Sequence, residues 1–286
     1  DNATGNLDQA EARIKDLADR PQLPQVLAIH TARLAESVGL YDQAESILVR
    51  NAKTSAKRED QLEYATFLGR RDRIKDALDV CEPLWNSSPN PDPIAPTVIA
   101  VLLSSRTFND PVQIARVSGW IERSLQQRPD SPLLTIALGT IRDREQRYAE
   151  AVDLYRKALA KSGGEVIPLN NLAWLLTLQG VKGAAPLDMI NRAINLRGPV
   201  PEFLDTRAVV YLTNGESRMA IEDLENAVAI DPTAARYFHL ARAYMEAGDL
   251  EAAKRSLVRA HDRGLSEADV HPLERAAFSQ VEKALK

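Results

Sequence analysis

One spacing constrains this chain more than any other feature: alanines recur along its C-terminal half at nearly constant intervals. Ala158, Ala193, Ala227 and Ala260 follow one another at 35, 34 and 33 residues. Around each alanine, a similar order of small, apolar and turn-forming residues returns. A repeat of this length is typical of stacked supersecondary units, because one such unit cannot bury its apolar face alone. We therefore expect an open stack of repeats.

Each repeat predicts two helices joined by a turn. Ala151, Tyr155 and Ala158 are four and three residues apart, so they share one face of a helix. Gly215 stands where a first helix must end, because glycine tolerates the positive φ of a reversing chain. Pro232 closes a second helix, since proline lacks the N–H that a helix interior needs. Aromatic residues make up only 5% of the chain, which also favours helices over strands.

This pattern resembles the tetratricopeptide repeat, a helix–turn–helix unit of about 34 residues. The resemblance implies an all-α fold, a right-handed α–α superhelix of about seven units with a partial unit before them and a capping helix after them. The clear repeats form the region 132–286, with units at 132–165, 166–200, 201–233 and 234–265 and the cap at 266–286. Degenerate repeats form the region 1–131, with a partial unit at 7–20 and units at 25–57, 58–91 and 92–131.

The two ends of the array carry separate expectations. Residues 7–20 predict a second helix without a first, and two explanations stay open: the chain is cut from a longer one, or this is a natural N-terminal capping helix. At the other end, residues 266–286 carry a helical apolar spacing. The dipeptide His271-Pro272 is expected to divide that stretch into a short turn and a final helix.

Charge and hydropathy narrow the classes of partner. The chain has 36 Lys plus Arg and 40 Asp plus Glu, for a formal net charge of -4. Nucleic-acid binding usually needs a basic face, so we expect no nucleic-acid partner. No apolar run approaches the ~18 residues of a membrane-spanning helix, so we expect no membrane insertion. No signal peptide is recognised, which predicts a cytoplasmic protein, or a periplasmic one if a leader has been removed.

The residues that could carry chemistry are few. The histidines are His30, His239, His261 and His271, and none lies three or four residues from another histidine or a cysteine. We interpret them as partly buried or surface side chains. Cys81 is expected to be a small buried apolar residue. Glycine-rich phosphate loops and nucleophile elbows are absent from the sequence. The sequence thus predicts a non-catalytic chain without catalytic residues, cofactor or metal.

The resemblance also implies a binding site. In tetratricopeptide proteins the first helices line a concave groove, and the matching positions here are Asn170, Trp174, Asp205, Val209, Phe238, Arg242 and Met245. Trp174 and Arg242 are of the types favoured as interface anchors. Two alternatives stay open, because Trp174 could instead pack between first helices and Phe238 could belong to the core. The apolar, mildly acidic lining favours a helix or extended segment with hydrophobic anchors, and the carboxylate-clamp pattern is not present.

These observations lead to one leading hypothesis and an alternative. The leading hypothesis is a tetratricopeptide scaffold that binds a protein or peptide segment in its groove and mediates protein–protein interaction or complex assembly. In the alternative, the chain is the regulatory or docking region of a larger enzyme, whose catalytic domain lies outside these residues. The partner would then be another domain of the same polypeptide. RNA recognition by a helical-repeat code is disfavoured by the net charge.

Overall fold

The computed structural model describes residues 2–20, 23–55, 57–104, 110–161 and 166–286. Throughout these ranges every regular element is a helix and no strand occurs. The expected all-α fold is therefore confirmed. The chain forms two compact units, residues 1–106 and residues 107–286, which we term the N-terminal unit and the C-terminal unit.

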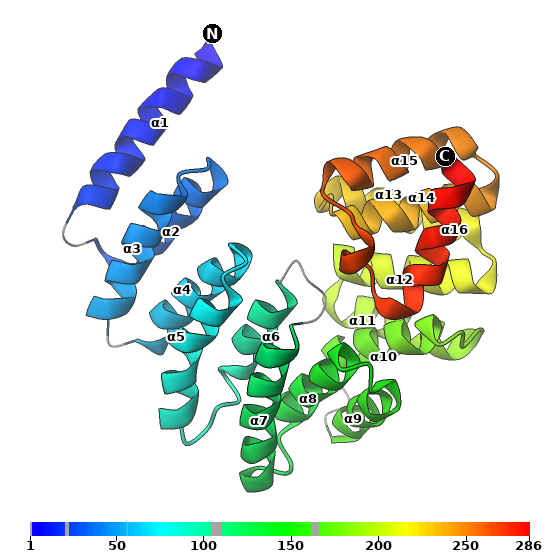
Figure 1. Cartoon of the computed structure of the whole chain (residues 1–286), viewed down its shortest axis with the longest axis horizontal. Coiled ribbons are helices and arrows are strands. Elements are labelled where there is room, and N and C mark those ends of the chain that lie inside the picture. Colours follow the sequence, from blue (N-terminus) through cyan, green and yellow to red (C-terminus); the bar gives the residue numbers. More distant parts are fainter. Residues whose placement is uncertain (1, 21–22, 56, 105–109, 162–165) are drawn as a thin grey trace. The chain divides into compact units, whose positions relative to one another are not determined.

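The N-terminal unit is built from helices that pack on their neighbours in sequence (Figure 1). Its described helices are α1 (Asn2–Asp19), α2 (Gln25–Ser37), α3 (Tyr41–Thr54), α4 (Arg58–Arg70), α5 (Ile74–Ser87) and α6 (Ala95–Leu103). The hairpins α2–α3 and α4–α5 match two predicted repeats. Small residues such as Ala44, Ala65 and Ala77 are fully buried and let the helices approach closely. Cys81 is fully buried on α5, as expected.

The C-terminal unit contains four successive helical hairpins (Figure 1). Its helices up to residue 262 are α7 (Pro111–Gln127), α8 (Pro132–Arg144), α9 (Tyr148–Lys161), α10 (Val166–Leu178), α11 (Ala184–Arg197), α12 (Pro201–Asn214), α13 (Ser217–Ile230), α14 (Ala234–Ala247) and α15 (Leu250–Asp262). The pairs α8–α9, α10–α11, α12–α13 and α14–α15 match the four clear repeats. Helices α6 and α7, which the sequence places in one repeat at 92–131, belong to different compact units.

Local chemistry ends these helices where the sequence predicts. Gly215 follows α12 with φ 83° in the left-handed region, and the next N–H, of Glu216, donates to the carbonyl of Tyr211 at 2.8 Å. Helix α13 ends at Ile230, just before Asp231-Pro232. The Asp249 carboxylate then accepts from the N–H of Ala252 at 2.9 Å and begins α15. Residues 104–110 are mostly polar and predict a long turn, and residues 105–109 of that stretch lie outside the described residues.

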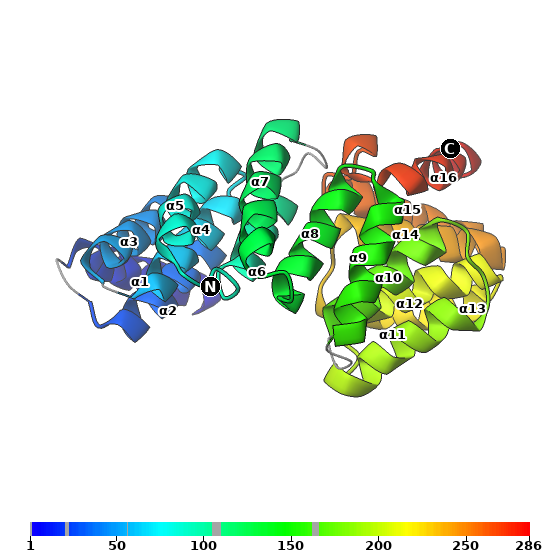
Figure 2. The same ribbon diagram turned by 90° about the horizontal axis from the view of Figure 1, so that it is seen from below.

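The chain ends in three short elements, of which the last, α16, packs on α14 and α15 (Figures 1 and 2). They are η1 (Glu267–Asp269), η2 (Pro272–Glu274) and α16 (Arg275–Leu285). The expected division at His271-Pro272 is confirmed. Phe278, Val281 and Leu285 bury one face of α16 in the core of the last two hairpins. We term residues 266–285 the C-terminal segment.

Candidate functional site

The predicted groove residues lie on three first helices of the C-terminal unit. Helix α10 carries Asn170 and Trp174, α12 carries Asp205 and Val209, and α14 carries Phe238, Arg242 and Met245. Equivalent positions on successive first helices are expected to lie side by side, because each repeat stacks on the next.

His239 on α14 brings three of these residues together. Its Nδ1 lies 2.6 Å from Oδ1 of Asp205. Its ring centroid lies 5.8 Å from that of Trp174 and 5.2 Å from that of Phe238. The His239 residue is only 2% exposed. The sequence predicts an ordinary partly buried or surface histidine at this position, whereas the side chain is buried and contacts Asp205, Trp174 and Phe238.

The C-terminal segment supplies the other partner of His239. Oε1 of Glu274 lies 3.1 Å from Nε2 of the imidazole, and Glu274 is itself buried. Both neighbours are carboxylates, which accept hydrogen bonds when ionised, so a protonated ring can donate on both sides. We call Asp205, His239 and Glu274 the His239 cluster.

The electrostatics of the cluster favour the charged imidazole. Burial by itself lowers the pKa of His239, because a low-dielectric interior disfavours the cation. The charges and hydrogen bonds of Asp205 and Glu274 outweigh that effect and raise the pKa to about 10. His239 is therefore an imidazolium at neutral pH, held between two carboxylates.

A second histidine ties the C-terminal segment to the first hairpin of this stack. Nε2 of His271 lies 3.2 Å from Oδ1 of Asp143 on α8. The N–H of Leu273 donates to Nδ1 of His271 at 3.2 Å, so Nε2 carries the proton and donates to Asp143. The ring lies edge-on to Trp174, with the centroids 6.5 Å apart. The segment thus reaches from α14 back to α8.

Apolar contacts follow the same path. Phe278 meets Phe238 edge to face, with ring centroids 5.5 Å apart, a favourable geometry for two aromatic rings. Leu273 packs on the cluster formed by α8, α9 and α10, which includes Ile136 and Leu172. Phe238 therefore lies beneath the C-terminal segment, 1% exposed, and Trp174 is half-buried beside both histidines.

The other predicted residues lie apart from the His239 cluster. Val209 is fully buried, and Met245 is half-buried against the terminal core. Nε of Arg242 donates to Glu246 on the same helix at 2.7 Å. The side-chain amide of Asn170 donates to Asn171, while its buried Oδ1 finds no hydrogen-bond partner among the described residues.

One sequence signal could have found the cluster. Asp205, His239 and Glu274 follow one another at 34 and 35 residues, which is the repeat period. Polar residues spaced by one period on first helices are expected to meet across the stack. The spacing does not indicate whether these side chains are buried. Their burial depends on the C-terminal segment, which folds back over α14.

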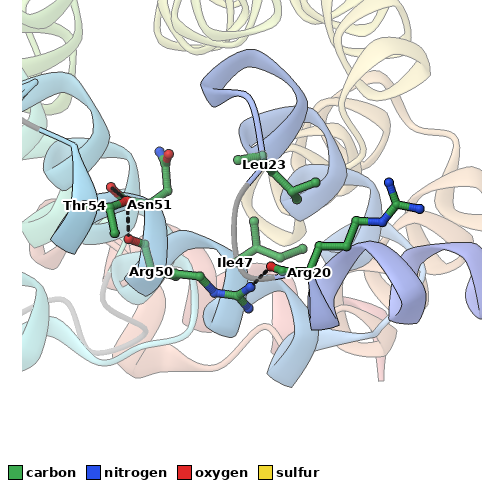
Figure 3. Close-up of a pocket in the computed structure, with 7 residues that line it drawn as sticks. Arg20, Leu23, Ile47, Arg50, Asn51 and Thr54 are labelled. Carbon is green, nitrogen blue, oxygen red and sulfur yellow. Dashed lines mark hydrogen bonds between the residues drawn. The ribbon is translucent and has the colours of Figure 1, made fainter.

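A separate hollow lies in the N-terminal unit (Figure 3). It has a volume of about 210 Å³ and is lined by Arg20, Leu23, Ala28, Ile47, Arg50, Asn51 and Thr54. The Arg50 guanidinium donates to the carbonyls of Ala18, at 2.5 Å, and of Arg20. It thereby satisfies the orphan carbonyls at the end of α1, and we interpret the hollow as part of the packing of α1 on α2 and α3.

In the described part of the chain, no group of three or more His, Cys, Asp or Glu side chains is arranged to hold a metal ion. None of its helices combines the length and the apolar character needed to cross a bilayer.

The repeat pattern, the hairpins and their stacking define a helical-repeat protein. Residues 201–233 and 234–260 match the family model described as tetratricopeptide repeat. The chain therefore contains tetratricopeptide repeats within residues 201–260, and it shares the fold of tetratricopeptide repeat proteins. Comparison with curated proteins gives no match.

Solved structures share the fold at low identity. A tetratricopeptide repeat protein from Parabacteroides merdae is 15% identical, with a TM-score of 0.58 over 91% of this chain and 98% of that one. A chain in the structure of the APC/C hetero-tetramer Cut9–Hcn1 is 14% identical, with a TM-score of 0.62 over 90% of this chain and 53% of that one. TTC0263, a thermophilic TPR protein of Thermus thermophilus, is 17% identical, with a TM-score of 0.51 over 68% of this chain and 98% of that one. The tetratricopeptide solenoid predicted from the sequence is confirmed.

Proposed function

We propose that this chain is a non-catalytic scaffold that binds a segment of a partner protein on the face formed by α8, α10, α12 and α14. Tetratricopeptide folds are in general protein-interaction scaffolds, and a structurally similar chain is part of the Cut9–Hcn1 hetero-tetramer. Fold alone names no ligand, so the proposal depends on the face itself.

One observation carries the proposal: this face already holds a stretch of polypeptide through its side chains. Asp143, His239 and Phe238 contact His271, Glu274 and Phe278 by a hydrogen bond, a charged hydrogen bond and an aromatic contact. Polar groups flanking aromatic anchors are typical of peptide-binding surfaces. The combination supports a groove that recognises polypeptide, with Asn170, Trp174, Asp205, Phe238, Arg242 and Met245 as its proposed lining. Val209, which is fully buried, offers no surface to a partner.

A peptide-display experiment tests the assignment. A random-peptide library is selected on the full chain, and the affinity of the recovered peptides is measured for the wild type, Trp174→Ala and Arg242→Ala. Lys254→Ala, an exposed cation on α15, is the matched control for Arg242→Ala. Anchor truncation typically costs more than ~1 kcal/mol, so we expect Trp174→Ala to weaken binding about tenfold and Lys254→Ala to leave it unchanged.

Peptides that bind Trp174→Ala and Arg242→Ala as tightly as the wild type would place the binding surface elsewhere. Circular dichroism of each variant establishes that the fold is retained.

A further inference from the structure

We propose that the C-terminal segment occupies this groove as an intramolecular ligand, and that the partner presents the same chemistry: an acidic residue for His239 and an aromatic residue four positions later for Phe238. The inference rests on the proposed function, because it names the partner class and the regulation of the same groove.

The C-terminal segment extends beyond the last hairpin and contacts helices three repeats earlier. A helix that only caps the last hairpin needs to contact α14 and α15, as Val281 and Leu285 do. His271 instead bonds to Asp143 on α8, three repeats earlier, and Leu273 packs on the cluster of α8, α9 and α10. The segment therefore spans the binding face as well as capping the stack.

The hydrogen-bonding needs of His239 define which side chain can bind next to it. One side of the His239 ring is paired with Asp205 of the groove wall, and the other side is paired with Glu274 of the segment. Without that second carboxylate, a buried N–H donor would lose an acceptor, which is unfavourable in a low-dielectric site. The groove is thus built to receive one acidic side chain at Nε2 of His239.

The spacing of the contacts defines the partner further. Glu274 is the N-cap of α16, and Phe278 lies one helical turn later, over Phe238. An acidic residue at a helix N-terminus also interacts favourably with the helix dipole. The partner is accordingly a short amphipathic helix that begins with Asp or Glu and carries Phe, Tyr or Trp four residues on.

Competition follows from the covalent connection. The segment follows α15 directly, so its effective concentration at the groove is high. A partner must displace it, and a substitution within the segment that weakens its contacts with the groove should raise the partner's affinity. The groove is closed by default.

The test adds the segment back in trans. A fluorescently labelled peptide of residues 266–286 is titrated, by anisotropy, into the wild type and into proteins carrying Glu274→Gln or Glu267→Gln. Glu267 is an exposed glutamate of the same segment, so its substitution is the matched control. We expect Glu274→Gln to bind the peptide about tenfold more tightly than the other two proteins, because a charged hydrogen bond contributes on the order of tenfold or more.

Two further arms assign the contact. The double variant His239→Gln/Glu274→Gln should lose the gain in peptide affinity. A peptide with Gln in place of Glu274 should bind weakly to the Glu274→Gln protein. If Glu274→Gln does not fold by circular dichroism, His271→Ala loosens the same segment while leaving His239 and Glu274 in place, and it should show the same gain.

The inference would be overturned if the wild type and the folded variant, Glu274→Gln or His271→Ala, bind the peptide equally well, or if neither binds it. If peptides from the display selection still depend on Trp174 in that case, the proposed groove stands and only its self-occupation fails. If they do not, both fail.

Discussion

The two units connect neighbouring first helices at the same sequence separation but in different environments. In the N-terminal unit, Arg70 of α4 makes two hydrogen bonds to Glu36 of α2, at 2.8 and 2.7 Å. In the C-terminal unit, His239 of α14 bonds to Asp205 of α12 at 2.6 Å. Both pairs are 34 residues apart. The Arg70 side chain is 39% exposed, whereas that of His239 is 3% exposed.

The difference shows that the repeat period determines which residues come into contact. Burial then determines how much the contact contributes to stability and how it affects protonation. Exposed ion pairs contribute little to stability, because water and salt screen them. A buried charge instead requires its partners, and its protonation responds to them. The same repeat period therefore gives a solvated ion pair in one unit and a buried charged cluster in the other.

The largest expected effect comes from removing the buried cation. His239→Gln leaves two carboxylates, Asp205 and Glu274, facing each other without a counter-charge. We expect the free energy of unfolding of the C-terminal unit to fall by about 3–5 kcal/mol in urea denaturation followed by circular dichroism. His30→Gln, at an exposed position on α2, should change it by less than ~0.5 kcal/mol. A loss below ~1 kcal/mol for His239→Gln would mean that the cluster is solvated like the pairs of α2 and α4.

Removing the aromatic contact comes next. Phe278→Ala should destabilise the C-terminal unit by about 3 kcal/mol, because a buried ring is lost from the core that includes Phe238. Hydrogen exchange of residues 266–285 should accelerate together with the loss of stability. Ser279→Ala, at an exposed position on the same helix, serves as the control. Unchanged exchange in Phe278→Ala would show that the segment is held without this contact.

The pH dependence of stability separates the two units further. The pKa of His239 is raised from 6.5 to about 10 in the folded state, so its contribution is complete below pH 6.5 and is lost as pH rises through about 10. Between pH 7 and 9, the difference in unfolding free energy between wild type and His239→Gln should shrink by roughly 1 kcal/mol per pH unit. A difference that stays constant over this range would contradict the raised pKa.

The smallest effect is expected in the N-terminal unit. Arg70→Gln removes an exposed pair with Glu36 and should cost less than ~1 kcal/mol. In 1 M NaCl, where the Debye length is about 3 Å, that cost should vanish. The same salt should leave most of the effect of His239→Gln in place. A salt-resistant loss for Arg70→Gln would remove the contrast between the units.

The repeats were predictable because their chemistry is local. Glycines at the ends of first helices, proline after a second helix and alanines one period apart fix hairpins without reference to distant residues. The resemblance to the tetratricopeptide repeat implied that Asp205, Trp174 and Phe238 lie on one face, and all three contact His239. The division of the chain between α6 and α7 could not be predicted, since the repeat pattern there is weak.

The site was predicted in part for the same reason. His239 occupies a first helix at the expected place, but its burial depends on Glu274, which follows the last hairpin. His271 and Asp143 are 128 residues apart, and no periodicity reports such a return of the chain. The sequence therefore indicated the proposed lining residues on the first helices and missed the contacts that the C-terminal segment makes with them.

The contact between Glu274 of the C-terminal segment and a charged His239 underlies the proposed groove and its proposed self-occupation. The most direct measurement is a pH titration of the imidazole ¹⁵N resonances of His239 in the wild type and in Glu274→Gln. We predict that both ring nitrogens of the wild type remain protonated at pH 8 and that Glu274→Gln lowers the pKa of His239. A His239 that titrates near 6.5 in both proteins would contradict the account.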